Sequence, residues 1–239
     1  MLLYSPLKRG FCMLLYVGNE EVHFSKKDLE NRYLNKGREG KVYQYRNEAL
    51  KIYTSELKYR KKLTESEVKK MSSVLTDRIL LPKKPVYNEE KKFIGYTMPF
   101  KIEAPKERIG LMKFKDLISD LELIKNDIDI ISKNNIELND LNCGSLLMTQ
   151  SNLFIGDPGA YTISNSSDTS DLYNYNVKKM NYYFTRMIFL EYLKLTKKEK
   201  EVLKEYFSID SEFFIDKINK ENIKSNQSTN ATLKKILLK

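Results

Sequence analysis

The chain has few of the residues on which metal centres and disulfide scaffolds depend. It contains two cysteines, Cys12 and Cys143, and one histidine, His23. The cysteines have no Cys-x-x-Cys spacing, so we predict neither a disulfide framework nor a structural zinc site, and a reducing compartment fits. A Ser-His-Asp triad would depend on His23 alone, which makes that class of hydrolase a poor candidate.

Glycine, proline and long apolar runs are also scarce. Nine glycines and six prolines among 239 residues exclude collagen-like and proline-rich chains. No apolar run approaches the ~18 residues of a membrane-spanning helix, and the start lacks the pattern of a signal peptide. We therefore expect no membrane span and a cytoplasmic location. Apolar residues make up 41% of the chain, which is enough for a folded core without covalent staples.

The chain is basic, with a net charge of +10, but it is poor in arginine. Of its 42 basic residues only eight are Arg, and the other 34 are Lys. Proteins that recognise phosphates favour the bidentate contacts of Arg. We therefore interpret the charge as solvated surface and regard nucleic-acid binding as the weaker hypothesis.

The first hundred residues favour short strands and one helix. β-rich segments flank a turn at 47–48, which predicts a hairpin, and two more strands are expected around 86–87 and 93–100. Between them, 55–75 is charged and free of Gly and Pro, so it is predicted to be helical. Glu67 shares the apolar stripe of this helix with Leu63, Met71 and Val74, and a carboxylate there needs a cationic partner.

The second part favours helices. Apolar residues recur at helical spacing over 114–132, and short strands are expected at 145–148 and 153–155. We predict a loop over 162–176, helices over 180–195 and 197–207, and a polar segment at 222–232 before a short amphipathic end. The pattern predicts an α+β, two-lobed chain: an extension (1–25), a strand-rich lobe (26–100), a shortened, mostly helical lobe (101–221) and a tail (222–239).

Four elements that carry chemistry occur in one order. Gly37 and Gly40 lie in a strand-turn-strand, where backbone amides can approach phosphate oxygens. Lys51 follows on the paired strand, and Glu67 on the next helix could hold it. Two carboxylates, Asp140 and Asp157, then flank a predicted hairpin that would bring them together.

This order resembles the protein kinase-like superfamily, and in particular compact bacterial Ser/Thr kinases. The family has a Gly-rich loop, an Ala-x-Lys strand, a helix Glu, a His-Arg-Asp loop followed by Asn, and Asp-Phe-Gly. The resemblance covers residues 30–160. It implies a fold of two lobes, an antiparallel sheet followed by helices, that binds ATP and Mg²⁺ in the cleft between them.

The resemblance also implies roles for individual residues. Gly37 and Gly40 match the second and third loop glycines, and Asn35 stands at the first. The adenine would contact Val42, Ala49, Leu147 and the segment from Met98 to Phe100. Lys51, oriented by Glu67, would hold the α- and β-phosphates, Asp140 would accept or orient the proton of the acceptor hydroxyl, and Asp157 would hold Mg²⁺, with Ser145 at the position of the second metal ligand.

Several positions depart from the family pattern. His-Arg-Asp becomes Leu138-Asn139-Asp140, so the arginine that receives an activating phosphate is lost. Ser145 replaces the metal-binding Asn, and a hydroxyl is a weaker ligand than an amide carbonyl. Pro158 replaces the Phe of Asp-Phe-Gly. Taken singly, each motif could be an ordinary turn or a solvated side chain, and only their joint order carries the interpretation.

The leading hypothesis is an ATP- and Mg²⁺-dependent phosphotransferase that acts on Ser or Thr of a protein substrate. The main alternative is a pseudokinase that acts as a nucleotide-binding or interaction module, motivated by Ser145, Asn139 and Pro158. A small-molecule kinase of the same fold is a further alternative.

Overall fold

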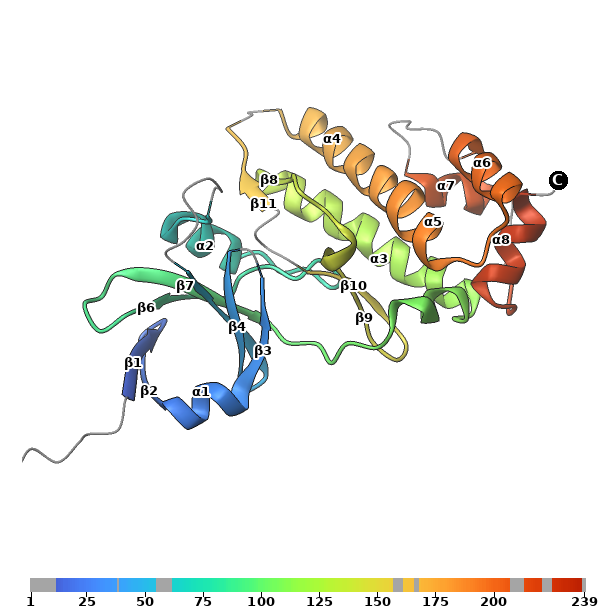
Figure 1. Ribbon diagram of the computed structural model, residues 1–239. Helices are drawn as coiled ribbons and strands as arrows, with labels where there is room; N and C mark the ends of the chain where they lie inside the picture. The colour runs from blue at the N-terminus through green and yellow to red at the C-terminus, as the bar shows by residue number, and fades with distance from the viewer. Residues whose placement is uncertain are drawn as a thin grey trace, which may run out of the picture. The chain divides into compact units, whose positions relative to one another are not determined.

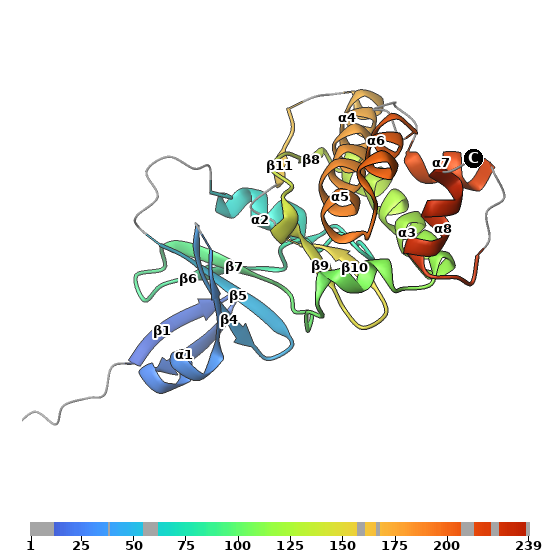
Figure 2. The same cartoon turned by 45° about the vertical axis from the view of Figure 1, so that its right-hand side comes forward.

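A computed structural model describes residues 12–37, 39–54, 62–156, 161–165, 168–206, 213–220 and 225–237. The chain divides into two units, shown in Figures 1 and 2. Residues 1–73 and 82–100 form the N-terminal unit, and residues 74–81 and 101–239 form the C-terminal unit. Within the described ranges no helix is both long and apolar enough to cross a membrane.

A curled seven-stranded antiparallel sheet forms most of the N-terminal unit (Figure 1). The strands lie in the order β2-β1-β6-β7-β5-β4-β3, and the predicted hairpin is the β4–β5 pair. The strands are β1 (Cys12–Val17), β2 (Glu20–Ser25), β3 (Tyr33–Lys36), β4 (Gly40–Tyr45), β5 (Glu48–Tyr53), β6 (Lys84–Tyr87) and β7 (Phe93–Pro99). The unit also contains helices α1 (Lys26–Arg32) and α2 (Glu65–Ser72).

One face of this sheet carries the apolar core of the unit. Side chains alternate between faces along a strand, and Tyr43 on β4 lies opposite Leu50 on β5, so both point to the same side. The core cluster on that side draws on the first two strands as well: Leu15, Val17, Phe24, Tyr43, Tyr45, Leu50 and Val86. Leu29 of α1 packs against it. The hairpin β1–β2 and α1 therefore supply part of the core.

The sequence analysis expected one helix in the first hundred residues, and the structure has a second, α1. Ser25 caps it: the Ser25 hydroxyl accepts the Asp28 N–H at 3.1 Å, and the Asp28 carboxylate accepts the Ser25 N–H at 3.0 Å. This reciprocal cap satisfies two backbone donors at the start of a short helix. The helix has seven residues and none of them is buried, so it carries no clear apolar periodicity.

Helix α2 is shorter than the predicted helix over 55–75. Residues 55–61 lie outside the described residues, and 62–64 are not helical. The helix begins after Thr64, whose hydroxyl accepts the Glu67 N–H, and Val68 and Met71 are its buried residues. Leu75 is 86% exposed. The apolar stripe therefore passes through Val68, and the position of Glu67 is only half-buried.

Helices dominate the C-terminal unit, which also contains four short strands among its described residues. The predicted helix over 114–132 is confirmed as α3, and its stripe from Leu117 to Ile131 is buried. The elements are η1 (Lys106–Gly110), α3 (Phe114–Lys133), β8 (Ile136–Leu138), η2 (Cys143–Ser145), β9 (Leu146–Met148), β10 (Leu153–Ile155), β11 (Tyr161–Ile163), α4 (Thr169–Tyr182), η4 (Tyr183–Ile188), α5 (Phe189–Tyr192), α6 (Lys197–Tyr206), α7 (Phe214–Lys220) and α8 (Thr229–Leu237).

Two segments of this unit differ from the prediction. Residues 162–176, predicted as a loop, contain the end of β11 and most of α4, because Asp168 caps the helix by accepting the N–H groups of Ser170 and Asp171. The predicted polar segment at 222–232 contains the start of α8. There Thr229 and Thr232 are buried beside Leu233, so hydroxyl-bearing residues belong to the packed face.

Two buried aspartates of α3 hold other parts of the unit in place. Asp127 is fully buried, and its carboxylate accepts the N–H groups of Asp77, Arg78 and Ile79 at 2.9, 2.6 and 2.7 Å. Asp120 accepts the N–H of Leu153 at 2.8 Å and pairs with Arg78 at 2.9 Å. Segment 74–81 and the β9–β10 hairpin are thus anchored to one helix, although neither aspartate stood out in the sequence.

Candidate functional site

Lys51 of β5 forms a nearly buried ion pair with Glu39. Its ammonium nitrogen donates to Glu39 Oε2 at 2.5 Å, and the two side chains are only 10% and 12% exposed. The same nitrogen lies 5.7 Å from the centre of the Tyr96 ring. A lysine held this way presents its charge at one place, because the carboxylate and the ring restrict its rotamers.

The glycine turn places Glu39 at this lysine. The Gly37 N–H donates to the Gly40 carbonyl at 2.9 Å, and the Thr54 N–H donates to the Glu39 carbonyl at 3.1 Å. A Cβ on Gly40 would lie 2.2 Å from the Ile52 carbonyl oxygen, so only glycine permits this approach of β4 to β5. These contacts fix the backbone on the C-terminal side of Glu39, and Arg38 lies outside the described residues.

The face of the sheet opposite the apolar core collects four of the residues assigned to ATP. Val42 lies across from Lys51 on β4 and β5, and Met98 on β7 lies across from Ala49. Because Ala49 and Lys51 are two residues apart on one strand, all four point to the same side. Ala49 is buried and Val42 and Met98 are half-buried. The predicted grouping of an apolar surface with a lysine is thus present within the N-terminal unit.

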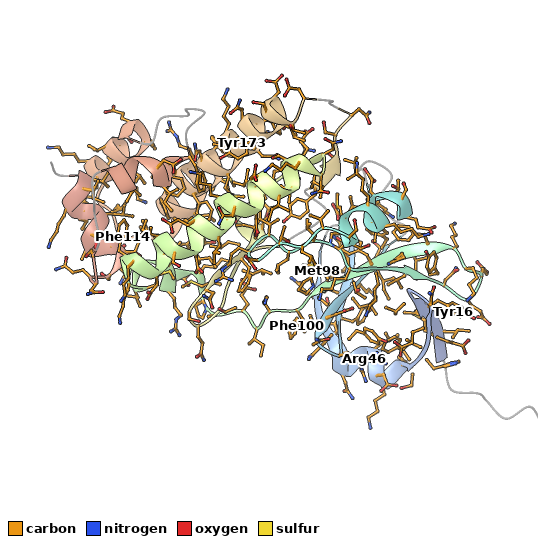
Figure 3. All side chains as sticks on the ribbon, turned by 180° about the vertical axis from the view of Figure 1, so that it is seen from behind. Tyr16, Arg46, Met98, Phe100, Phe114 and Tyr173 are labelled. Carbon is orange, nitrogen blue, oxygen red and sulfur yellow. The ribbon has the colours of Figure 1, made fainter. Side chains whose placement is uncertain are left out.

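The remaining residues predicted for this unit lie at its turn, its strand ends and its helix. Asn35 is exposed on β3, and its side chain accepts the N–H of Lys36 at 2.7 Å. Phe100 follows the end of β7 and is labelled with Met98 in Figure 3; its N–H donates to the Asn47 carbonyl at 3.3 Å. Glu67 Oε2 accepts the Thr64 N–H at 2.8 Å, which closes the cap of α2.

Glu39 is the residue of this site that the sequence analysis missed. Glu67 was named as the carboxylate for Lys51, because it falls on the helix that follows. A signal for Glu39 was available: Gly40 pairs with Tyr53 across the hairpin, which puts the residue before Gly40 near the strand of Lys51. A carboxylate between two turn glycines is therefore within reach of a lysine on the next strand.

In the C-terminal unit, Asp140 lies in an ordered loop that begins at a buried residue. Leu138 is fully buried, so it packs in the core, as the sequence analysis expected. Its N–H donates to the Asn176 side chain at 2.9 Å, and Asn176 in turn donates to the Ile136 carbonyl and to Ser132. Asp140 itself is exposed, and its role as the residue that accepts or orients the proton stays a prediction.

The loop after Asp140 closes in a small hydrogen-bonded turn. The Asn142 N–H donates to Ser145 Oγ at 3.2 Å, and the Asn142 side chain accepts the Gly144 N–H at 2.8 Å. Ser145 is fully buried. The Ser145 hydroxyl thus has a structural partner in the turn, and its role as a metal ligand stays a prediction.

The predicted hairpin between Asp140 and Asp157 is confirmed. Strands β9 and β10 pair antiparallel, with Leu147, half-buried, opposite Phe154. At its end the Gly156 N–H donates to the Ser145 carbonyl at 2.8 Å. The chain therefore returns to the Asp140 loop at the residue before Asp157. Asp157 and Pro158 lie outside the described residues.

Asn139, the residue before Asp140, has a structural role. Its side-chain amide donates to the Thr162 hydroxyl at 2.6 Å, and its carbonyl oxygen accepts from the Tyr175 hydroxyl at 3.1 Å. The amide therefore links the Asp140 loop to β11 and α4. Asn176 on the same helix holds the preceding strand, and the sequence analysis missed it because it had assigned that region to a loop.

Comparisons with solved structures show which fold these units belong to. No protein-family model matches the chain, and no curated protein matches its sequence. The kinase domain of PknI from Mycobacterium tuberculosis matches with a TM-score of 0.52 and 12% identity, over 80% of this chain and 94% of that chain. The chain has a protein kinase-like fold. A substituted form of the same PknI domain matches with a TM-score of 0.51, 11% identity and the same coverage.

The kinase-like fold confirms the predicted α+β architecture, an antiparallel sheet followed by helices. The residues described in the N-terminal unit suit a nucleotide in kind: a nearly buried ammonium group shares a sheet face with apolar side chains, beside a turn that requires glycine. Within the described residues, no group of three or more His, Cys, Asp and Glu side chains is arranged to hold a metal ion.

Proposed function

We propose that the protein is a phosphotransferase that moves the γ-phosphoryl group of ATP to a Ser or Thr hydroxyl of a protein. The observation that carries the proposal is Lys51, whose nearly buried ammonium group lies on one sheet face with Val42, Ala49 and Met98 in a kinase-like fold. A buried cation next to a small apolar surface is the combination that a nucleotide needs, because its phosphates are anionic and its base is flat and largely apolar.

Each residue then has a stated task. Lys51 binds the α- and β-phosphate oxygens and holds the nucleotide in register. Asp140 accepts a hydrogen bond from the acceptor hydroxyl and takes its proton as the oxygen attacks phosphorus, while the bond from phosphorus to the leaving ADP oxygen breaks. Asp157 is the residue that would hold Mg²⁺, which supplies neutralisation of the charge on the phosphates. The chain's contribution is positioning and electrostatics.

A pseudokinase is the second candidate, and two contacts favour it. The Ser145 hydroxyl is fully buried in the turn that it closes, and Lys51 already has a carboxylate partner in Glu39. A protein of this kind would bind nucleotide weakly or not at all and would act through its surface.

Single-turnover consumption of radiolabelled ATP with Mg²⁺ or Mn²⁺ separates these candidates. We expect wild type to transfer or hydrolyse phosphate, and Lys51→Ala and Asp157→Ala to lose about 100-fold or more in rate, as when one preorganised charge is removed from an active site. Lys84→Ala is the matched control, because Lys84 also pairs with a buried glutamate of the sheet, Glu48, at 3.2 Å. ATP binding without turnover in wild type would favour the pseudokinase. Equal rates in wild type and Lys51→Ala would show that Lys51 neither binds the phosphates nor holds the nucleotide for transfer.

A further inference from the structure

We propose that Glu39 competes with the nucleotide's phosphates for Lys51, so that the glycine turn carries its own inhibitory carboxylate. This inference rests on the proposed function, which assigns Lys51 to those phosphates. The direct observation is the 2.5 Å contact between the Lys51 ammonium nitrogen and Glu39 Oε2, with both side chains almost closed to water.

The origin of the carboxylate decides its role. Glu39 belongs to the turn between Gly37 and Gly40, the segment whose backbone amides the sequence analysis expects to approach phosphate oxygens. A carboxylate that comes from this turn and ends at Lys51 lies between the two groups that would bind phosphate. Since phosphates and a carboxylate carry the same sign of charge, both cannot occupy that space without strong repulsion.

The surroundings of Lys51 leave little room for sharing. The ammonium group could in principle donate to several acceptors, since it carries three hydrogens. Here the Tyr96 ring lies 5.7 Å from the nitrogen, and the lysine as a whole is 8% exposed. A phosphate that takes the place of the Glu39 carboxylate at this nitrogen therefore requires the Glu39 side chain to rotate away.

The backbone contacts of the turn show how such a movement is limited. The Thr54 N–H donates to the Glu39 carbonyl at 3.1 Å, and Gly40 packs directly against the backbone of β5. These contacts fix the main chain on the C-terminal side of Glu39. Release of Lys51 therefore requires a rotation of the Glu39 side chain or opening of the turn on its Gly37 side, and the ion pair opposes both.

Binding measurements on the full chain test the inference. Titration calorimetry would compare ATP with Mg²⁺, adenosine and inorganic tripolyphosphate on wild type and on Glu39→Gln, which keeps the shape of the side chain and removes its charge. We expect Glu39→Gln to bind ATP and tripolyphosphate about tenfold more tightly than wild type, because the competing charge is gone. Adenosine, which has no phosphate, should bind both proteins equally.

Two further variants keep the result interpretable. Glu39→Ala removes the side chain altogether and should also tighten ATP binding, even if the amide of Glu39→Gln retains a hydrogen bond to Lys51. Glu20→Gln is the matched control, because Glu20 forms an ion pair with Arg46 in the same unit. It changes the net charge equally and should leave the ATP affinity unchanged. Circular dichroism would confirm that each variant is folded.

The outcomes separate this inference from the proposed function. If wild type binds ATP and both Glu39 variants bind it equally or more weakly, Glu39 supports Lys51 instead of competing for it, and the inference fails while the proposed function stands. If only the Glu39 variants bind ATP, both are supported. If folded wild type and both folded variants bind neither ATP nor tripolyphosphate, the proposed function and the inference fail together.

Discussion

At the scale of single residues, the buried polar side chains that the structure describes bond to the backbone more often than to one another. Asn176 holds Leu138 and Ile136 through main-chain groups, and Asp127 accepts three consecutive N–H groups. Such side chains are costly to bury unless they are fully hydrogen-bonded. They therefore mark the loops whose conformation depends on one side chain.

The Asp127 carboxylate provides a test at this scale. We expect Asp127→Asn to lower the free energy of unfolding by about 1–3 kcal/mol, because its amide group would turn an N–H donor toward a backbone N–H. The control is Asp129→Asn on the same helix, which loses a half-exposed ion pair with Lys133 and should cost less than about 0.5 kcal/mol. Urea denaturation of the three proteins measures both values.

The difference in unfolding free energy between wild type and Asp127→Asn should also depend on pH. Burial raises the pKa of Asp127 above its ordinary value, although the three N–H donors oppose the shift. A carboxyl group with a raised pKa in the folded state stabilises the fold most when it is protonated, and this contribution is lost as the pH rises through the folded pKa. The stability gap between wild type and Asp127→Asn should therefore narrow from pH 4 to pH 7. A gap that widens with pH would mean that the N–H donors outweigh burial.

What the sequence could predict at this scale depended on spacing along the chain. The placement of Lys51 on a strand and of Leu138 in the core follows from motif order. The role of Asp140 stays a prediction. The partner of Lys51 did not follow from motif order. By their positions in the sequence, Glu39 and Glu67 could each pair with Lys51. Glu39 does so because the glycine turn folds back over β5. Asn176 depends likewise on a contact across 38 residues.

At the scale of elements, strands β4 to β7, the β9–β10 hairpin and the long helix α3 were predictable, because their apolar residues alternate or recur with a clear period. The hairpin β1–β2 was not predicted, since its residues were assigned to an extension. The errors have local causes. Thr64 starts α2 later than the charge pattern suggested, and Asp168 starts α4 inside a segment rich in Ser and Asn. In α8 the buried face includes Thr229 and Thr232, which a hydrophobic pattern does not count. Caps and buried hydroxyls thus explain where periodicity alone gave the wrong boundary.

The hairpin β1–β2 provides a test at this scale. Leu15 on β1 is 1% exposed and belongs to the same core cluster as Tyr43 and Leu50. We expect Leu15→Ala to destabilise the fold by about 2–5 kcal/mol, because a cavity would remain in the core of the N-terminal unit. Leu34→Ala on β3 is the control, since Leu34 is 40% exposed. If thermal unfolding of the two variants is the same, the hairpin is not part of that core.

At the scale of the whole molecule, the surplus of positive charge is distributed over helices that also carry acids. Ion pairs with spacing of three or four residues recur along the chain: Lys26–Glu30, Lys69–Glu65, Lys133–Asp129 and Lys204–Glu201. Each such pair contributes little to stability, but it offsets the local positive potential. A net charge of +10 is thus compatible with a surface that has no dedicated site for nucleic acid.

This distribution predicts how the protein responds to nucleic acid. We expect fluorescence anisotropy with two unrelated 20-base-pair duplexes to show equal, weak binding at 50 mM NaCl that falls steeply by 200 mM, because such binding comes from the release of counterions. At physiological salt the dissociation constant should be no tighter than about 10⁻⁶ M. A preference for one duplex that persists at 200 mM NaCl would contradict the interpretation, because it would require contacts to base edges and a cluster of basic residues shaped to place them. Equal loss of binding to both duplexes would instead mean that the lysines act as a solvated surface. Phosphate recognition would then have to be sought at Lys51, which is nearly buried in its ion pair with Glu39.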